Sequence, residues 1–117
     1  MKVCLAGTGA MAVIHMKALR KIDGVDVVSV NGRTGDSARA FAAEWGIPHY
    51  STNLEESIDR PGVDAVILTT PSAMHADQAV MALVKGKHVQ VEIPMSLNLP
   101  DAQRIVDATK RSGRICM

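Results

Sequence analysis

Short apolar runs alternate with segments of helical periodicity along the whole chain, and this alternation limits the fold more than any other feature of the sequence. The runs lie at residues 3–6, 25–30, 65–68, 89–91 and 115–117. Two of them, 3–6 and 65–68, are apolar at every position, which is typical of parallel strands that helices cover on both faces. The pattern predicts successive strand–helix–strand units and therefore an α/β fold with a central parallel sheet.

The segments between the runs each carry one apolar stripe. Residues 38–45 are apolar at positions i, i+3, i+4 and i+7, and residues 76–84 repeat this spacing over two turns. Gly46 and Gly86 follow these segments and are expected to end the two helices. A last helix is expected at residues 99–111. The longest gap between clear strands is expected to hold a short strand and a short helix, at residues 49–52 and 54–58.

Six parallel strands joined by right-handed crossovers predict a doubly wound sheet in the order 3-2-1-4-5-6. The winding then reverses between the first and fourth strands, and the turns after these two strands face each other across a crevice. At 117 residues the chain is long enough for one domain with its own core and too short for two domains of ordinary size. We therefore predict a single Rossmann-type domain over residues 1–117.

The turn after the first apolar run reads Gly7-Thr8-Gly9-Ala10-Met11-Ala12, a G-x-G-x-x-A pattern between a strand and a helix. Backbone amides in a first helical turn lack partners within the helix, and the helix dipole adds positive potential, so this turn suits the pyrophosphate of a dinucleotide. The same pattern on its own also suits a tight turn that binds nothing. Five residues are expected to approach the pyrophosphate with backbone atoms: Gly7, Thr8, Gly9, Ala10 and Met11.

Polar residues follow the fourth and fifth strands on the other side of the crevice. Thr69, Thr70 and Pro71 are expected to lie along the cofactor, although the Thr70 hydroxyl suits capping of the next helix equally well. Glu92 is expected to orient the nicotinamide ribose or to accept hydrogen bonds from nearby amides. His75 would reach the nicotinamide end or cover the helix surface. Glu92 and His75 are the candidate catalytic residues.

The end of the second strand indicates which nucleotide binds. It reads Val30-Asn31-Gly32-Arg33-Thr34 and holds no carboxylate before Asp36. Domains that prefer NAD usually have an acidic residue there, which accepts hydrogen bonds from the adenosine ribose. In the turn that Gly32 opens, Arg33 instead offers a planar cation and Thr34 a hydroxyl to a ribose 2′-phosphate. We predict NADP over NAD, with a solvated turn as the alternative interpretation of Arg33.

Charge and composition exclude several classes of partner. Thirteen Lys and Arg against twelve Asp and Glu give a formal charge of +1, without the run of like charges that nucleic acid or an anionic membrane attracts. No apolar stretch approaches the roughly 20 residues of a membrane span, so we expect a soluble, cytoplasmic protein. Cys4 and Cys116 are interpreted as small buried hydrophobes, and no metal site is expected. His15, His49 and His88 have no evident partner and are interpreted as structural.

Three motifs in register resemble those of the Gfo/Idh/MocA oxidoreductases, the family of glucose-fructose oxidoreductase and inositol dehydrogenase. They are residues 7–12 with His15 after them, Thr70-Pro71-Ser72-Ala73-Met74-His75, and Glu92-Ile93-Pro94. The resemblance covers the whole chain. It implies hydride transfer between a nicotinamide cofactor and a hydroxyl or hemiacetal carbon of a small acidic or sugar-like substrate, with Pro94 among the cofactor-binding residues. Residues 22–25, 63–68 and 86–94 look most like a branch that uses NADP to oxidise a ring-cleavage hemiacetal to a lactone in protocatechuate breakdown.

The chain departs from the family pattern in two ways. Ile93 stands where the family has a lysine near the nicotinamide, and an aliphatic side chain neither donates a proton nor stabilises an alkoxide. The branch named above shares this isoleucine. Family members also carry a second domain that forms the substrate pocket, and this chain ends where that domain would begin. The apolar run 115–117 ends in mid-strand, which favours an isolated domain over a natural stand-alone protein.

Two functions therefore remain open. The first is a dehydrogenase whose general base comes partly from the second domain, and whose full-length form is expected to be a homo-oligomer. The second is a non-catalytic NAD(P)-binding or sensing module. In the first case the 117 residues alone are expected to bind NADP weakly and to turn over nothing.

Overall fold

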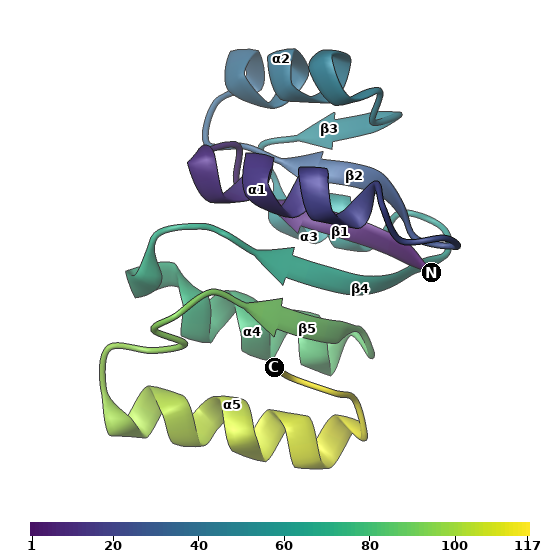
Figure 1. The fold of residues 1–117 in the computed structure, drawn as a ribbon. Coiled ribbons are helices and arrows are strands. Elements are labelled where there is room, and N and C mark those ends of the chain that lie inside the picture. The colour runs from purple at the N-terminus through teal and green to yellow at the C-terminus, as the bar shows by residue number, and fades with distance from the viewer.

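A computed structural model describes all 117 residues and confirms the α/β fold, with one parallel sheet and helices on both faces (Figure 1). The sheet has five strands in the order β3-β2-β1-β4-β5, and every pairing is parallel. β1 lies between β2 and β4, so the winding reverses there as a doubly wound sheet requires. The strands are β1 (Lys2–Ala6), β2 (Asp26–Asn31), β3 (His49–Ser51), β4 (Val63–Leu68) and β5 (His88–Val91).

The prediction of six full strands is wrong in one respect. The last apolar run lies beside β5, where the predicted order puts it, but it forms only one parallel bridge, between Val89 and Cys116. Val89 N donates to Ile115 O at 2.9 Å and Met117 N donates to Val89 O at 3.0 Å. The pairing does not extend toward the start of β5, because Ile115 N donates to the His88 ring at 3.1 Å instead of to a strand carbonyl.

The helices begin and end where local chemistry favours it. Thr34, Asn53 and Asn98 each accept a hydrogen bond from a first-turn amide and cap the helix that follows. Gly46 and Gly113 end two helices in the left-handed conformation, at φ of +66° and +65°, which glycine adopts without strain. The helices are α1 (Ala10–Leu19), α2 (Gly35–Trp45), α3 (Leu54–Ile58), α4 (His75–Val84) and α5 (Leu99–Ser112), with a short 3₁₀ helix η1 (Ser72–Met74) before α4.

Two apolar cores lie on opposite faces of the sheet, and β1 contributes to both. Val3 and Leu5 pack with residues of α1 and α2 on one face, whereas Cys4 and Ala6 pack with residues of α3, α4 and α5 on the other. All four side chains are buried. This two-sided burial explains why the run is apolar at every position.

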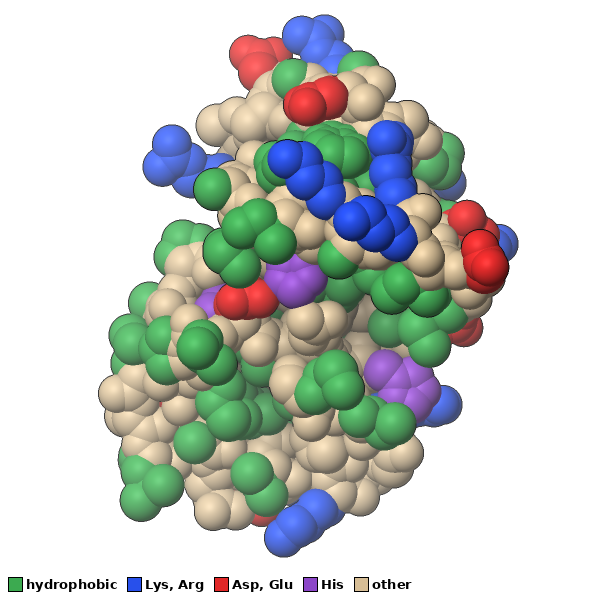
Figure 2. All heavy atoms as spheres, viewed as in Figure 1, with side chains coloured by type: hydrophobic (Ala, Val, Ile, Leu, Met, Phe, Trp, Pro, Cys, Tyr) green, Lys and Arg blue, Asp and Glu red, His purple; other side chains and the backbone are tan.

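One part of the sheet has no helix over it. On the face that carries α1, Figure 1 shows no helix over β5 or over the side of β4 next to it, although Ile67 of β4 is buried in the core shared with α1, and Figure 2 shows hydrophobic side chains over the lower half of that face. A hollow of about 370 Å³ lies there, lined mainly by hydrophobic residues of β1, β4, β5 and the final run. None of the helices combines the length and the apolar character that a membrane crossing requires.

Candidate functional site

The glycine turn joins β1 to α1 at the carboxyl edge of the sheet. Gly7 has φ of +112°, and its amide donates to Asn31 O at 2.8 Å. A Cβ at Gly7 would overlap the Thr69 hydroxyl oxygen and would lie 2.9 Å from the Thr69 carbonyl oxygen. The fold itself therefore requires glycine at position 7, both for its backbone conformation and for the close approach of β1 to the end of β4.

Gly9 differs, because the protein around it does not require a glycine. Its φ is −88°, which any residue adopts, and no heavy atom lies within 4 Å of the position that a Cβ would take. As the N-cap residue of α1 it provides no side-chain cap, and the first turn of α1 contains no acidic residue. The first turn of α1 thus has no side-chain cap for its amides and has open space at Gly9, an arrangement that fits a bound pyrophosphate. Thr8 is half-buried, while Ala10 and Met11 are exposed in this first turn.

Thr69 and Thr70 follow β4 at the carboxyl edge of the sheet, next to the glycine turn. The Thr69 amide and hydroxyl both donate to Ala6 O at 2.8 Å, which ties the end of β4 to the end of β1. The Thr70 hydroxyl donates to the side chain of Gln78, a buried residue of α4. The alternative interpretation of Thr70 as a helix cap is therefore wrong, because its hydroxyl bonds to a side chain and not to a first-turn amide. Pro71 is exposed beside it.

His75 lies inside the protein and not on the surface of α4. Its side chain is buried, with Nε2 2.7 Å from Thr70 O and Nδ1 2.9 Å from Pro94 O. Both partners are backbone carbonyl oxygens, which only accept hydrogen bonds, one in the loop after β4 and one in the loop after β5. The ring therefore joins the loop after β4 to the loop after β5. The expectation that His75 covers the helix surface is contradicted by this burial.

Glu92 follows β5 and contacts His15, for which the sequence indicated no partner. Its Oε1 lies 2.6 Å from Nε2 of His15 on α1, and the two side chains are 25% and 14% exposed. The Glu92 amide donates to Leu68 O at 3.1 Å, which holds this residue against the end of β4. His15 is the only polar side chain in residues 10–16, and that was the signal available in the sequence. Ile93, the next residue, is 89% exposed.

The residues after β2 have separate tasks. Gly32 is buried, and a Cβ there would lie 2.9 Å from the Ala38 Cβ, so this glycine lets β2 approach α2. Thr34 caps α2 by accepting from Ser37 N at 3.2 Å. Arg33 is exposed, and no hydrogen bond or ion pair holds it. A free guanidinium thus lies at the end of β2, the position at which NAD-preferring domains have a carboxylate.

The remaining histidines have partners away from the glycine turn. His49 Nδ1 contacts the Ser29 hydroxyl at 3.0 Å, and its Nε2 lies 3.4 Å from the Glu56 carboxylate. The Ser51 hydroxyl donates to Glu56 and, ahead of the His49 contact, holds the pKa of Glu56 below its usual value. His88 accepts from a backbone amide of the final run. The interpretation of these two histidines as structural agrees with these contacts.

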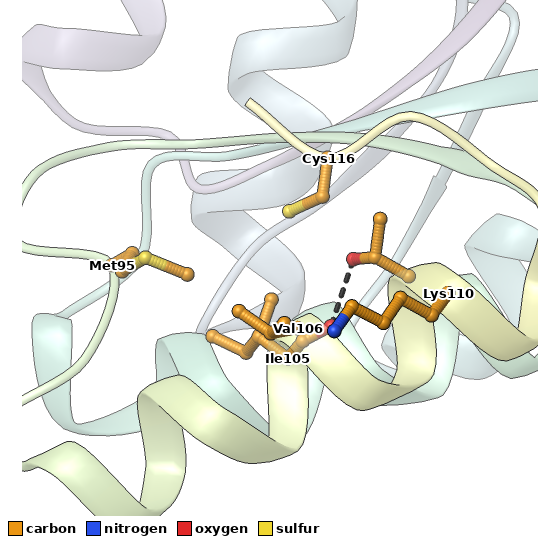
Figure 3. A pocket seen from close by; sticks show the side chains of 6 residues that line it. Met95, Ile105, Val106, Lys110 and Cys116 are labelled. Atoms are coloured by element: carbon orange, nitrogen blue, oxygen red, sulfur yellow. Dashed lines mark hydrogen bonds between the residues drawn. The ribbon is translucent and has the colours of Figure 1, made fainter.

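Neither cysteine is activated as a nucleophile. Burial raises the pKa of the Cys4 thiol to about 12, against a smaller opposing effect of the Ser29 hydroxyl. Cys116 lines a hollow of about 230 Å³ between α5 and the loop after β5, together with Met95 (Figure 3). Burial also raises the pKa of this second thiol. A thiolate is the reactive form of cysteine, so both side chains behave as packing residues near neutral pH.

Comparison with known proteins identifies the family. A family model described as "Oxidoreductase family, NAD-binding Rossmann fold" matches residues 1–117. The chain belongs to the Gfo/Idh/MocA oxidoreductases. This Gfo/Idh/MocA domain is 44% identical over 117 residues to 4-carboxy-2-hydroxymuconate-6-semialdehyde dehydrogenase of Sphingobium sp. strain NBRC 103272 / SYK-6, covering all of this chain and 37% of that protein.

Two further relatives show the range of the family. The domain is 32% identical over 116 residues to an NAD(+)-dependent scyllo-inositol 2-dehydrogenase of Bacillus subtilis, covering 98% of this chain and 34% of the relative. Among solved structures, a probable dehydrogenase from Thermotoga maritima superposes with a TM-score of 0.95 at 27% identity, covering all of this chain and 35% of that one. The domain thus spans about a third of the length of the proteins that it matches.

Proposed function

We propose that this domain is the nucleotide-binding part of an NADP-dependent oxidoreductase. The observation that carries the proposal is the first turn of α1, which has no cap at Gly9 and open space in front of it. A side chain caps the first turn of α2, α3 and α5. Only α1 and the η1–α4 segment begin without such a cap. An anionic pyrophosphate would satisfy the free amides there.

In this proposal different residues bind different parts of NADP. The backbone of residues 7–11 holds the pyrophosphate, and Arg33 and Thr34 hold the adenosine ribose 2′-phosphate. Glu92 contacts the nicotinamide end together with the loop segments that contain Thr70 and Pro94, which His75 holds together. Bound NADP would supply the hydride acceptor, and the protein would bind and orient it.

The substrate proposal comes from the relatives. The 44% identity to the semialdehyde dehydrogenase over all 117 residues supports an acidic substrate that is oxidised at a hemiacetal or hydroxyl carbon. Ile93 is exposed next to Glu92 and cannot move a proton, so we assign proton acceptance at this edge to Glu92 or to residues outside these 117. We further propose that the full-length enzyme is cytoplasmic and homo-oligomeric, and that these 117 residues alone bind the cofactor without turnover.

The test is a titration of the 117-residue chain with NADPH and with NADH, followed by energy transfer from Trp45 to the reduced nicotinamide. We expect tighter binding of NADPH. Arg33→Ala should weaken NADPH at least about tenfold, since one charge-assisted phosphate contact is lost, and should change NADH little. Arg111→Ala is the matched control, an exposed arginine near the end of α5. Equal effects of Arg33→Ala on both cofactors would contradict the phosphate role, and absence of binding would contradict the proposal as a whole.

A further inference from the structure

The contact between His15 and Glu92 joins the two halves of the doubly wound sheet. His15 lies on α1 of the first half, and Glu92 follows β5 of the second half, 77 residues further along the chain. A carboxylate only accepts hydrogen bonds, so the short contact requires a hydrogen on Nε2 of His15.

The contact occupies one oxygen of Glu92 and leaves the other available. Oε1 faces His15, whereas no protein atom makes a hydrogen bond to Oε2, and the side chain is 25% exposed. The backbone of Glu92 is fixed as well, through its amide bond to Leu68 O. A carboxylate held at its backbone and at one oxygen presents the second oxygen in a defined direction, which favours recognition of hydroxyl donors.

We propose that His15 is a positioning residue, which fixes the Glu92 carboxylate so that Oε2 accepts from the hydroxyls of the nicotinamide ribose. This inference rests on the proposed function, because it requires NADP in the crevice. His15 acts through Glu92 and not on the reacting atoms. The same contact also ties α1 to β5, so the experiment must separate positioning from a purely structural tie.

The experiment compares two ligands on five forms of the 117-residue chain: wild type, His15→Ala, His15→Gln, Glu92→Gln and the double variant His15→Ala/Glu92→Gln. NADPH contains the nicotinamide ribose, whereas adenosine 2′,5′-bisphosphate lacks it and retains the 2′-phosphate. We expect His15→Ala to weaken NADPH about tenfold and to leave adenosine 2′,5′-bisphosphate unchanged, since only the nicotinamide half contacts the carboxylate that His15 positions. His15→Gln should restore most of the affinity, because the Gln amide nitrogen occupies the place of Nε2 and donates to the carboxylate.

The double variant His15→Ala/Glu92→Gln should bind NADPH no more weakly than Glu92→Gln alone, because the histidine acts only through that carboxylate. Circular dichroism and urea unfolding check that each variant is folded. Unchanged NADPH binding in His15→Ala overturns the inference, and so does an equal loss for both ligands in a folded variant, which indicates a structural tie. A wild type that binds neither ligand overturns the proposed function, and the inference with it.

Discussion

The two glycines of the turn should respond in opposite ways to the same substitution, serine. Gly9→Ser places its side chain in open space at an N-cap with extended backbone, where serine accepts from a first-turn amide. Serine gains a few tenths of a kcal/mol over glycine as a cap, and the reduced freedom of the unfolded chain adds about 0.4–1 kcal/mol. We expect Gly9→Ser to be more stable by about 0.7–1.3 kcal/mol.

Gly7→Ser should destabilise the same domain strongly. The left-handed backbone at φ of +112° costs about 1–2 kcal/mol for a residue with a Cβ. The new Cβ would also push Thr69 away from Ala6 O, which breaks two hydrogen bonds of about 1 kcal/mol each. The sum is about 3–4 kcal/mol, a large part of the roughly 5–15 kcal/mol that stabilises an ordinary domain.

Gly9→Ser should weaken NADPH binding although it stabilises the domain. The serine at position 9 takes the space in front of the first-turn amides and bonds to one of them. Loss of two charge-assisted hydrogen bonds, at about 1.5 kcal/mol each, weakens NADPH at least about 100-fold. Urea unfolding, followed by Trp45 fluorescence and circular dichroism, gives the stabilities, and energy transfer to NADPH gives the affinities. Wild-type affinity in Gly9→Ser would refute the placement of the pyrophosphate, and wild-type stability in Gly7→Ser would refute the steric argument.

Three other predictions concern stability and reactivity. His75→Ala should lower the free energy of unfolding by about 2–4 kcal/mol, because a buried ring and its bonds to two loops are lost; a change below about 0.5 kcal/mol in urea unfolding would contradict this role. Cys4, with its pKa raised to about 12, should resist a thiol reagent at about pH 8 until the protein unfolds, whereas Cys116 should react slowly in the native state. Equal reaction rates of the two cysteines in the native protein would contradict this prediction. The folded pKa of Glu56 lies below its ordinary value of 4.5, so the contribution of this carboxylate to stability is present above that pH and is lost as pH falls through the folded pKa. In Glu56→Gln the midpoint of urea unfolding should therefore fall less between about pH 6 and about pH 3 than it does in the wild type. The same fall in both proteins would argue against the Ser51 contact.

Local chemistry made most of the fold predictable. The run at residues 3–6 became a central strand that is buried on both faces, and the glycines that follow α2 and α5 end those helices in the left-handed conformation. The structure of the last run was harder to predict, because pairing along a strand depends on which groups compete for each backbone amide. The His88 ring takes the Ile115 amide, and no periodicity in the sequence indicates that contact.

The candidate site was predictable only in part. Its backbone elements follow from strand order, which is enough to place the glycine turn and Thr69 next to each other at the carboxyl edge of the sheet. Side-chain partners were not predictable, since they join residues far apart in the chain. Thr70 bonds to Gln78 and not to the backbone, and His75 lies inside the protein and not on its surface.

The sequence by itself determined the strand–helix alternation, the position of the glycine turn and the absence of a carboxylate after β2, because these depend on residue type and spacing within short segments. Only the tertiary structure decided that Gly7 is required by the fold while Gly9 borders open space, and that His15 reaches Glu92. Those distinctions depend on distances between β1, β4, α1 and β5. Such distances exist only once packing has brought the separate segments together.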